Sequence, residues 1–311
     1  MTARRLDGTA WAATIRAELQ PRVDAFAHGH GRPPGLAVVL AGDDPASEIY
    51  VRNKIATVAQ HGCRGELFRL PSTASVDEAL ALVQRLNGDD SVDAILVQSP
   101  LPSAMGDDAE QRVFDAIEPL KDVDGFHPVN VGRLVQKRQA LVACTPLGCA
   151  ELLDRERIPL RGRHAVVIGR SDIVGKPMAL LLLHRDATVT ICHSRTTNLA
   201  ATCRTADVLV AAVGRAGFVT PEFVKPGATV IDVGINRLTE AADVAAFFQE
   251  GSRRRQQFEA KGSVLIGDVH PDVEAVAGAI TPVPGGVGPL TIAMVLGNTV
   301  TAAERRAALR R

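Results

Sequence analysis

The hydrophobic and polar positions of this chain alternate between helical and strand patterns over its first half. Apolar residues recur at helical spacing over Gly8–Ala27, and the continuous apolar run Leu36–Leu40 is typical of a buried parallel strand. The pattern that follows predicts, in chain order, helix Ser47–His61, strand Glu66–Leu70, helix Val76–Leu86 and strand Asp93–Gln98. Such an alternation indicates an α/β fold.

A second series of the same kind begins near residue 145. Cys144-Thr145-Pro146 predicts the start of a helix, because Thr or Cys can cap it and proline suits its first turn. The elements predicted after it are strand Ala165–Ile168, helix Val174–Leu183, and strands Thr188–Cys192, Val208–Val213 and Thr229–Val233. Leu238–Lys261 is charged and predicts a peripheral helical insertion. The chain therefore forms two α/β units that divide near residue 145.

Length and composition narrow the class of protein. With 311 residues, of which 46% are apolar, the chain can form two domains with cores of their own. No apolar run approaches the roughly 20 residues that span a bilayer, so no membrane association is expected. The start, MTARRLDGTAW, lacks the apolar core of a signal peptide, which predicts a protein of the cytoplasm. The net charge is zero and no basic stripe stands out, so nucleic acid is not an expected partner; the run Arg253–Arg255 predicts a solvated helix face.

Cysteine and lysine usage bear on the chemistry. The five cysteines are odd in number and lack CxxC spacing, which favours cytosolic thiols over a disulfide framework or a zinc site. Only six of the 35 basic residues are lysines. Arginine keeps its proton in proteins, whereas a desolvated lysine can lose it. A lysine in the middle of a helix is therefore a candidate for proton transfer.

The segment Ile280–Pro289, ITPVPGGVGP, is the most distinctive stretch. Six of its ten residues are Gly or Pro, it carries no charge, and it leads into an apolar helical pattern with Pro289 suited to the first turn. One interpretation is a buried turn between two elements. The other is a rigid loop at a helix N-terminus, where glycines allow a ligand to approach the backbone amides.

The strand AVVIG and the turn after it resemble a dinucleotide-binding loop. From Gly169 the sequence reads G-x-S-x-x-x-G, with Ser171 at the second glycine position and one extra residue before the last glycine. The turn follows a strand, opens a helix, and precedes a second strand end by about 20 residues. That strand end carries Ser194 and Arg195 in place of the acidic residue typical of NAD enzymes. Together with Arg170 they favour a 2′-phosphate and hence NADP, with ordinary surface basicity as the alternative.

Tyr50 and Lys54 lie one helical turn apart on one face of a predicted helix. The simplest alternative is an amphipathic helix whose lysine reaches solvent. The Tyr-x-x-x-Lys spacing also matches the short-chain dehydrogenases, in which the glycine-rich loop precedes the pair. Here Lys54 precedes Gly169 by more than a hundred residues, and this order argues against that family.

Several segments, taken together, resemble one enzyme family. They are ASEIYVRNK (46–54), VQSPLP (97–102), KDVDGFHPVNVGRL (121–134), CTPLG (144–148), GRSDIVGKP (169–177) and TPVPGGVGP (281–289). In this order they resemble the bifunctional methylenetetrahydrofolate dehydrogenase/methenyltetrahydrofolate cyclohydrolase family, from about residue 6 to residue 304. The resemblance implies two α/β domains around a cleft, with the C-terminal helix returning to the first. Residues 1–145 plus 281–311 would form the folate-binding catalytic domain and 146–280 the Rossmann-like NADP-binding domain, in a homodimer.

The resemblance also assigns roles to individual residues. Lys54 matches the catalytic lysine, Gln98 the glutamine that hydrogen-bonds it, and Asp124 the carboxylate that holds the pterin. The substrate-contacting positions would be Tyr50, which stacks on the folate rings, and the backbone of Pro284, Gly285 and Gly286. The NADP-contacting positions would be Gly169, Arg170, Ser171, Ser194 and Ile235, with Arg195 added from the charge argument. Two departures are Ser99, where leucine is usual, and the longer Leu238–Lys261 stretch.

These residue types suit the chemistry that the resemblance implies. Oxidation of the methylene bridge gives a cation stabilised by its flanking nitrogens, so the dehydrogenase step needs mainly alignment with NADP. Hydrolysis of the methenyl cation needs water activation, for which a partly desolvated Lys54 beside Gln98 is a reasonable general base or polariser, and no metal is needed.

Two other functions remain to be weighed. A monofunctional dehydrogenase is disfavoured by the intact Lys54, Gln98 and Asp124. A non-catalytic nucleotide-binding regulatory module would not need the pair of Tyr50 and Lys54.

Overall fold

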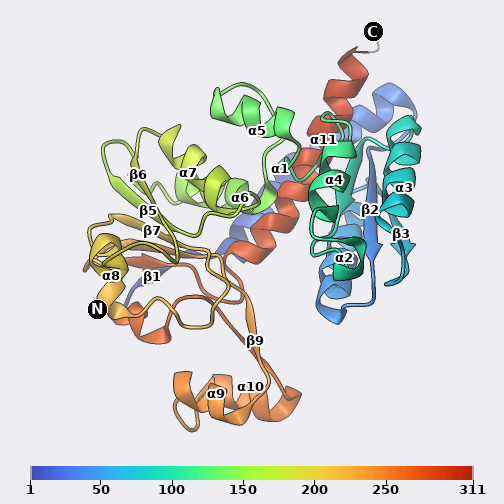
Figure 1. Ribbon diagram of the computed structural model, residues 1–311. Helices are drawn as coiled ribbons and strands as arrows, with labels where there is room; N and C mark the ends of the chain where they lie inside the picture. Colours follow the sequence, from blue (N-terminus) through green and yellow to red (C-terminus); the bar gives the residue numbers. More distant parts are fainter. Residues whose placement is uncertain (1, 310–311) are drawn as a thin grey trace. The chain divides into compact units, whose positions relative to one another are not determined.

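The computed structural model describes residues 2–309, which form two compact α/β units (Figure 1). One comprises Met1–Trp11 and Thr145–Leu290 and is called here the six-stranded unit. The other comprises Ala12–Cys144 and Thr291–Arg311 and is called the three-stranded unit. Two long helices, α1 (Gly8–His30) and α11 (Val287–Leu309), contain residues of both units.

The three-stranded unit is built on a parallel sheet of order β3-β2-β4. Its strands are β2 (Gly35–Ala41), β3 (Arg64–Leu70) and β4 (Ala94–Val97), and its shorter helices are α2 (Pro45–Gln60), α3 (Val76–Gly88), α4 (Ala109–Ala116) and α5 (Pro128–Val135), with a 3-10 turn at Ser103–Met105. Ala37 and Val39 of β2 pack with α3 and α4 on one face. Gly65, paired with Leu36, faces α2 on the other. All of β2 is buried, which explains its continuous apolar run.

The six-stranded unit contains a fully parallel sheet of order β1-β11-β8-β7-β5-β6. Its strands are β1 (Arg4–Arg5), β5 (His164–Ile168), β6 (Thr188–Cys192), β7 (Val208–Ala211), β8 (Thr229–Asp232) and β11 (Ala279–Ile280), with helices α6 (Cys144–Arg155), α7 (Gly175–Leu183) and α8 (Leu199–Cys203) and 3-10 turns at Pro221–Phe223 and Pro271–Ala275. The chain runs from β5 outward to β6 and then returns to β7 on the other side of β5. This reversal creates a topological switch point, where α/β sheets bind nucleotides.

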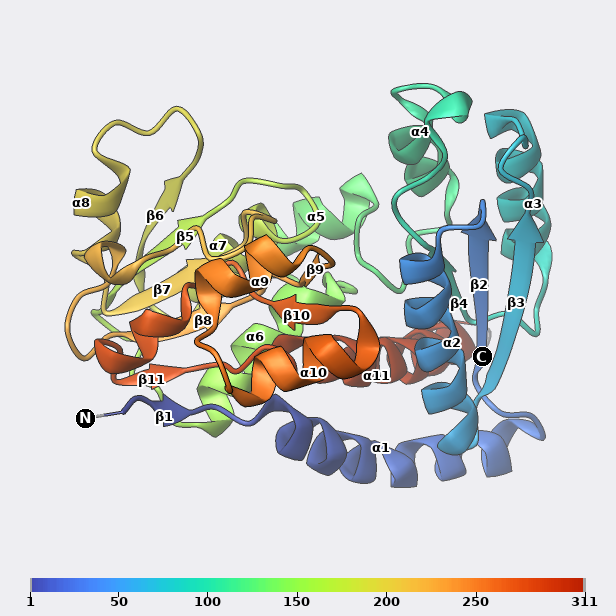
Figure 2. The same ribbon diagram turned by 90° about the horizontal axis from the view of Figure 1, so that it is seen from below.

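An inserted segment projects from β8 of the same unit (Figure 2). It consists of the antiparallel strands β9 (Asn236–Leu238) and β10 (Val264–Ile266) and the helices α9 (Ala241–Phe247) and α10 (Arg253–Lys261). Leu238, Val244, Val264 and Ile266 form a small core of its own. The helical expectation for this stretch holds, and the strands β9 and β10 frame the two helices.

The run Arg253–Arg255 on α10 differs from the expected solvated face. Only Arg253 is exposed. Arg254 is half-buried and donates to the carbonyl oxygen of Val283, and Arg255 is half-buried and donates to the carbonyl oxygen of Phe248 at 2.7 Å. The prediction of a fully solvated face was therefore wrong, because these side chains satisfy backbone carbonyls that the sequence pattern does not reveal.

Residues near both ends of the chain belong to the six-stranded unit. The chain passes from one unit to the other between Cys144 and Thr145, and α11 carries it back to the three-stranded unit. Residues 2–11 and 281–290 lie with the six-stranded unit. The reason is the pairing of β1 with β11, supported by a hydrogen bond of 3.0 Å from the Thr9 amide to the Gly285 carbonyl. A two-residue strand such as β1 gives no periodic signal in the sequence.

Candidate active site

Lys54 and Gln98 meet in the three-stranded unit. The helix that carries Lys54, α2, begins at Pro45, and the Asp44 side chain caps it by accepting from the Ser47 amide at 2.8 Å. Lys54 is only 9% exposed, and its Nζ donates to Gln98 Oε1 at 3.0 Å. Within residues 2–309, the hydrogen-bond partner given for this ammonium group is thus the neutral amide oxygen of Gln98.

Gln98 is held in position directly after β4. Its backbone amide donates to the Val39 carbonyl at 2.9 Å, and its side-chain Nε2 donates to the Ser99 carbonyl at 2.7 Å. With the amide nitrogen engaged there, the side-chain oxygen points at Lys54. The glutamine is therefore oriented as an acceptor for this lysine.

Ser99, the residue in place of the usual leucine, makes polar contacts. Its hydroxyl donates to Glu110 Oε1 at 2.6 Å, and the same oxygen accepts from the Leu101 amide at 2.9 Å. Glu110 lies on α4, so this carboxylate ties the loop after β4 to that helix. Ser99 thus has a specific partner, Glu110, which the sequence did not reveal.

Asp124 is partly buried and feels the charge of Lys54. Burial raises the pKa of the Asp124 carboxyl, while the Lys54 charge and a hydrogen bond from the Cys144 thiol oppose that rise. The backbone directly before Asp124 is held by Asn298 of α11, whose Nδ2 donates to the carbonyl of Val123 at 2.8 Å and also to that of Val142 at 2.9 Å. Sequence analysis missed Asn298 and assigned Cys144 only to a helix start.

The first two residues of the KDVD motif are structural. Lys121 is fully buried, and its Nζ donates to three carbonyl oxygens, those of Leu86, Asn87 and Asp89, at 2.7–2.8 Å. Asp122 is also buried and accepts from the His127 amide at 2.8 Å and from Asn130 Nδ2 at 2.9 Å. Of the four residues in the motif, Asp124 is the charged side chain that stays partly accessible.

Tyr50 lies one turn before Lys54 on α2, and its side chain is partly exposed. The structure thus places Lys54, Gln98 and Asp124 close together within one unit, with Tyr50 on the adjoining helical turn. Among residues 2–309, no group of three or more His, Cys, Asp or Glu side chains is arranged to hold a metal ion.

The predicted nucleotide loop lies at the carboxyl end of β5, at the switch point. Gly169 has a φ of +125°, and a Cβ at Gly175 would lie 2.3 Å from the Gly169 carbonyl oxygen, so both positions need glycine. Ser171 Oγ accepts from the amides of Val174 and Gly175 at 3.2 and 3.3 Å. This closely packed turn has the shape that a dinucleotide requires.

Three polar side chains remain available around this turn. Arg170, Ser194 and Arg195 are all exposed, and within residues 2–309 neither arginine side chain has an ion pair. Ser194 and Arg195 follow β6, the neighbour of β5, so all three lie at the carboxyl edge of the sheet. A glycine cradle flanked by uncompensated guanidinium groups fits a dinucleotide that carries an additional phosphate.

Two buried aspartates hold the loops that follow β7 and β8. Asp268 accepts from the amides of Val213, Gly214 and Arg215 at 2.7–2.9 Å. Asp232 accepts from Gly234 at 3.0 Å, Asp268 at 2.9 Å and Val269 at 3.0 Å. Ile235, predicted to contact NADP, is exposed at the end of the second of these loops. Sequence analysis did not single out either aspartate.

The Gly- and Pro-rich segment is packed against the start of α1. A Cβ at Gly8 would lie 1.7 Å from the carbonyl oxygen of Gly286, and Gly286 is itself buried. Pro284 is exposed and Gly285 has a φ of +105°. The segment leads directly into α11, whose first turn contains Pro289. The interpretations of a packed turn and of a backbone surface open to a ligand both fit this geometry.

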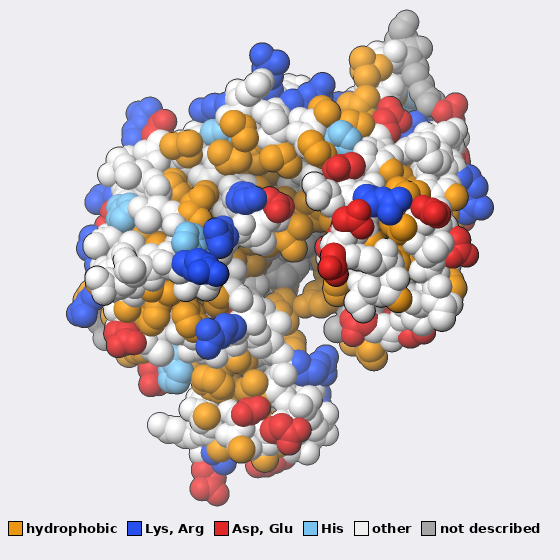
Figure 3. Space-filling model, viewed as in Figure 1, with side chains coloured by type: hydrophobic (Ala, Val, Ile, Leu, Met, Phe, Trp, Pro, Cys, Tyr) orange, Lys and Arg blue, Asp and Glu red, His pale blue; other side chains and the backbone are white. Residues whose placement is uncertain are grey.

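On the face seen in Figure 3, charged side chains of the two signs are unevenly distributed. In the view of Figure 3, Lys and Arg side chains gather over the part of the surface formed by the six-stranded unit, and Asp and Glu side chains stand out over the three-stranded unit. A basic surface suits a phosphate-bearing cofactor. None of the helices within residues 2–309 is long and apolar enough to cross a membrane.

Comparison with known proteins agrees with this geometry. Residues 6–124 match the family described as "Tetrahydrofolate dehydrogenase/cyclohydrolase, catalytic domain". Residues 143–307 match its companion, "Tetrahydrofolate dehydrogenase/cyclohydrolase, NAD(P)-binding domain". The chain belongs to the tetrahydrofolate dehydrogenase/cyclohydrolase family. This membership confirms the resemblance inferred from the motifs and the α/β fold with a nucleotide-binding domain.

Individual members of the family are similar over nearly the whole chain. The Bifunctional protein FolD of Solibacter usitatus is 56% identical over 305 residues, which cover 98% of each chain. The crystal structure of FolD from Campylobacter jejuni is 40% identical, with a TM-score of 0.85 over 98% of this chain and 99% of that one. The Trypanosoma brucei enzyme, solved with NADP and an inhibitor, is 37% identical, with a TM-score of 0.87 over 99% of both chains.

Proposed function

We propose that this protein oxidises methylenetetrahydrofolate to methenyltetrahydrofolate with NADP and then hydrolyses the methenyl group to give 10-formyltetrahydrofolate. Membership of the family supports both activities. The observation that carries the second one is the hydrogen bond of 3.0 Å from the buried Lys54 to Gln98. A monofunctional dehydrogenase would have no need of a buried lysine kept beside a fixed amide.

We assign to Lys54 the proton transfers of the hydrolysis. Water adds to the methenyl carbon and loses one proton, which leaves a neutral hydroxyl adduct. The ring C–N bond then breaks as that nitrogen gains a proton and the hydroxyl loses its own proton to become the formyl C=O, so one proton is released overall. A single amine that alternates between its neutral and charged forms can serve both transfers. Gln98 accepts from the ammonium form and so keeps the Nζ atom in place, without itself exchanging a proton.

Asp124 and Tyr50 would bind the substrate. A carboxylate pairs well with the amino group and ring N–H of a pterin, which are adjacent hydrogen-bond donors. The partly exposed Tyr50 offers an aromatic surface for stacking against a flat ring. For Pro284, Gly285 and Gly286 we retain the role of backbone contact with the folate. Pro284 is exposed and Gly285 is partly exposed, and a turn with few side chains lets a ligand approach its backbone closely.

NADP would be held by the loop after β5 and by the residues that follow β6. Gly169 and Ser171 would contact its phosphates through the turn, Arg170, Ser194 and Arg195 its 2′-phosphate, and Ile235 its nicotinamide half. When bound, NADP supplies the hydride acceptor of the oxidation. No proton transfer is required in that step, so the chain contributes mainly orientation.

We further propose a homodimer located in the cytoplasm. Strand β6 forms one end of the described six-stranded sheet. Two large apolar side chains at or near this edge, Leu183 and Ile191, are 54% and 41% exposed. An edge strand flanked by exposed apolar groups suits pairing with a second copy. Sedimentation of the wild-type protein beside a variant carrying Ile191→Lys would test this proposal, and an unchanged mass for the variant would contradict an interface at β6.

The catalytic proposal is tested by mixing the protein with methylenetetrahydrofolate and NADP and following absorbance. Formation of NADPH without accumulation of the methenyl absorbance indicates both activities. A methenyl product that accumulates and decays only at the uncatalysed rate would indicate a monofunctional dehydrogenase. No NADPH at all, with NADP still bound, would indicate a regulatory module.

A further inference from the structure

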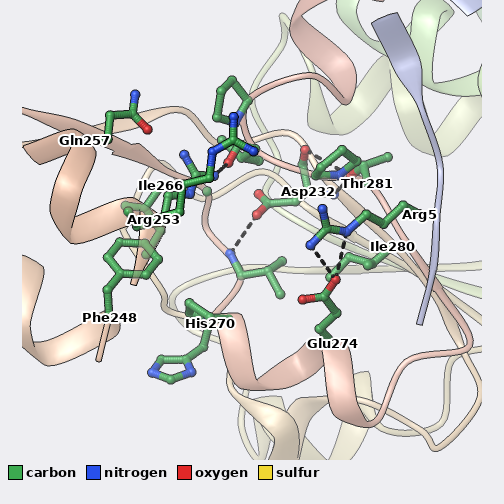
Figure 4. Close-up of a pocket in the computed structure, with 17 residues that line it drawn as sticks. Arg5, Asp232, Phe248, Arg253, Gln257, Ile266, His270, Glu274, Ile280 and Thr281 are labelled. Atoms are coloured by element: carbon green, nitrogen blue, oxygen red, sulfur yellow. Dashed lines mark hydrogen bonds and ion pairs between the residues drawn. The ribbon is translucent and has the colours of Figure 1, made fainter. Parts of the chain in front are cut away.

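A cavity of about 580 Å³ lies in the six-stranded unit, beside the inserted helix α10. Its wall is formed by β1, by the ends of β8 and β11 and by the inserted segment. In Figure 4, Arg5 lies on the β1 side of this cavity, and Phe248, Arg253 and Gln257 lie on the side of the inserted segment. The volume is sufficient for a small metabolite.

The acidic groups of the wall are already engaged. Glu274 forms an ion pair with Arg5 at 3.0 Å. The carboxylate of Asp232 accepts three backbone amides and has no arginine hydrogen-bonded to it within the described residues. Neither acid is therefore available to neutralise the arginines on α10.

Arg253 and Arg254 remain uncompensated. Within residues 2–309 the Arg253 side chain has no hydrogen bond or ion pair. Arg254 is half-buried, and its partners there are the neutral Val283 carbonyl and the Phe248 ring, whose centroid lies 5.9 Å from the guanidinium carbon. Burial and the nearby charges of Arg253 and Arg5 lower the pKa of Arg254. The cavity thus has three guanidinium groups in its wall, and one carboxylate, that of Glu274, is paired with them. This excess of positive charge favours binding of an anion in the cavity.

The rest of the lining suits an organic ligand. Ile266, Ile280 and Val283 are apolar, and Phe248 presents a ring. A guanidinium that stacks on an aromatic ring keeps its N–H edge free for a second partner. The cavity therefore combines an apolar floor with cationic groups, as small-molecule sites do.

We propose that this cavity is a second ligand site, which binds a small molecule carrying two or more phosphate or carboxylate groups. Arg253, Arg254 and Arg5 contact these groups, and Phe248 contacts the remainder of the ligand. The site is separate from the nucleotide loop, because neither Gly169 nor Ser194 lines the cavity. Val283 and Pro284 line the cavity, so a ligand bound there would contact the Gly- and Pro-rich segment.

Two sources could supply such groups. One is a free phosphate-bearing metabolite, for which the site would act as an effector site. The other is a γ-linked glutamate tail on the folate substrate, and this possibility alone rests on the proposed function. Both present oxyanions that guanidinium groups can bind in a bidentate manner.

Calorimetric titration of the full-length protein without folate or NADP tests the proposal. The probes are inorganic pyrophosphate and the peptide tri-γ-glutamate. We expect saturable binding of at least one of them, weakened about 10- to 100-fold by Arg253→Gln and by Arg254→Gln, since each variant removes a charge-assisted contact. The control is Lys261→Gln, which removes the same charge from α10 at an exposed position outside the cavity lining and should leave the affinity unchanged.

The two variants differ in structural risk. Arg254 also bonds to Val283, so its replacement can disturb that loop, whereas the exposed Arg253 makes no such bond. Binding of pyrophosphate alone identifies a free phosphate ligand, and binding of the peptide identifies a substrate tail. Absence of binding for both probes, or equal affinity in wild type and Arg253→Gln, overturns the proposal. A dehydrogenase assay on the same preparation keeps this outcome distinct from failure of the proposed function.

Discussion

The Nζ atom of Lys54 donates a hydrogen bond of 3.0 Å to the side-chain oxygen of Gln98, and the lysine is almost fully buried. Within the described residues this buried ammonium group is held by a neutral amide, and no carboxylate is hydrogen-bonded to it. The two reactions should therefore depend on Lys54 to different extents, because the hydrolysis needs a group that carries protons and the oxidation does not.

Replacement of Lys54 by methionine should abolish cyclohydrolase activity and leave part of the dehydrogenase activity. Methionine keeps the apolar stem but exchanges no proton, while hydride transfer depends mainly on alignment. Lys54→Arg is the matched control for charge: arginine stays protonated, so it too should fail in hydrolysis. Rates of methenyl decay and NADPH formation measure the two steps, and wild-type hydrolysis in either variant would remove Lys54 from the mechanism.

Replacement of Asp124 by asparagine should weaken both activities together by about 10- to 100-fold in kcat/KM, because a charged hydrogen bond to the substrate contributes roughly 1.5–3 kcal/mol. The loss is shared since the two reactions use the same bound pterin. Asn130→Ala serves as a comparison that disturbs the neighbouring Asp122 and leaves Asp124 in place. A loss confined to one of the two reactions would reassign Asp124 from anchor to chemistry.

Arg170 and Arg195 should determine the choice of cofactor. Both are exposed and without an ion pair among residues 2–309, and a 2′-phosphate carries close to two negative charges. Alanine at both positions should raise the KM for NADP about 10- to 100-fold and leave that for NAD nearly unchanged. Raised salt should reduce the wild-type preference, because the site is open to solvent.

Kinetics with both cofactors at two ionic strengths measure this effect. Arg161→Ala removes an exposed arginine of the same unit that pairs with Asp186, and it should change neither constant. Equal losses for NAD and NADP in the double variant would show that the two arginines support the loop only.

A buried ion-pair network around Asp93 should dominate the stability of the three-stranded unit. Asp93 is 1% exposed and accepts from Arg32 at 2.6 and 2.9 Å, from the Gly35 amide at 2.9 Å and from Arg306 of α11 at 2.8 Å. Asp93→Asn removes the buried carboxylate charge that faces both Arg32 and Arg306, which should cost about 3–5 kcal/mol of unfolding free energy.

Urea titration followed by circular dichroism measures this cost. The control is Asp77→Asn, which breaks an exposed pair with Arg112 at 3.4 Å and should change stability by less than about 1 kcal/mol. If both variants lost the same unfolding free energy, the buried ion pairs of Asp93 would contribute no more to stability than an exposed pair.

Asp232 should make the six-stranded unit less stable as the pH rises from about 4 to 7. Burial raises the pKa of its carboxyl to about 7, although three backbone amides oppose that rise. Between its unfolded pKa of about 4 and this value the folded form binds more protons, so stability falls with increasing pH and is flat above about 7. Asp232→Asn should remove this slope, as seen in melting temperatures between pH 5 and 8. A parallel pH dependence in the variant would contradict the assignment.

Helices and strands with a clear apolar pattern were predicted from the sequence. Short strands that form only by pairing with a distant segment were not. Runs such as Leu36–Leu40 are buried on both faces, so apolar content alone reveals them. By contrast β1 is a strand only because β11 offers it hydrogen bonds from more than 270 residues away. Short elements of this kind carry no periodicity of their own.

The candidate site shows the same division. Lys54, Gln98 and Asp124 were found from motifs, because reactive groups require particular residue types. The residues that hold the surrounding loops in place were not predicted. Asn298 bonds to a backbone carbonyl, Cys144 bonds through its thiol to Asp124, and Glu110 accepts from the Ser99 hydroxyl, and the fold alone brings these partners together. Asp232 and Asp268 were missed for the same reason, since an aspartate that binds backbone amides looks like any other in the sequence.

The hydrogen bonds from α11 set an order of events during synthesis. Asn298 fixes the carbonyls of Val123 and Val142, and Arg306 neutralises Asp93, yet Asn298 is translated more than 150 residues after Val142. At roughly 5–20 residues per second, a ribosome needs on the order of 10–30 s to make the intervening chain. Through that interval the part of the three-stranded unit already made has neither the hydrogen bonds from Asn298 nor the ion pair with Arg306. A fragment ending at residue 144 would lack both permanently.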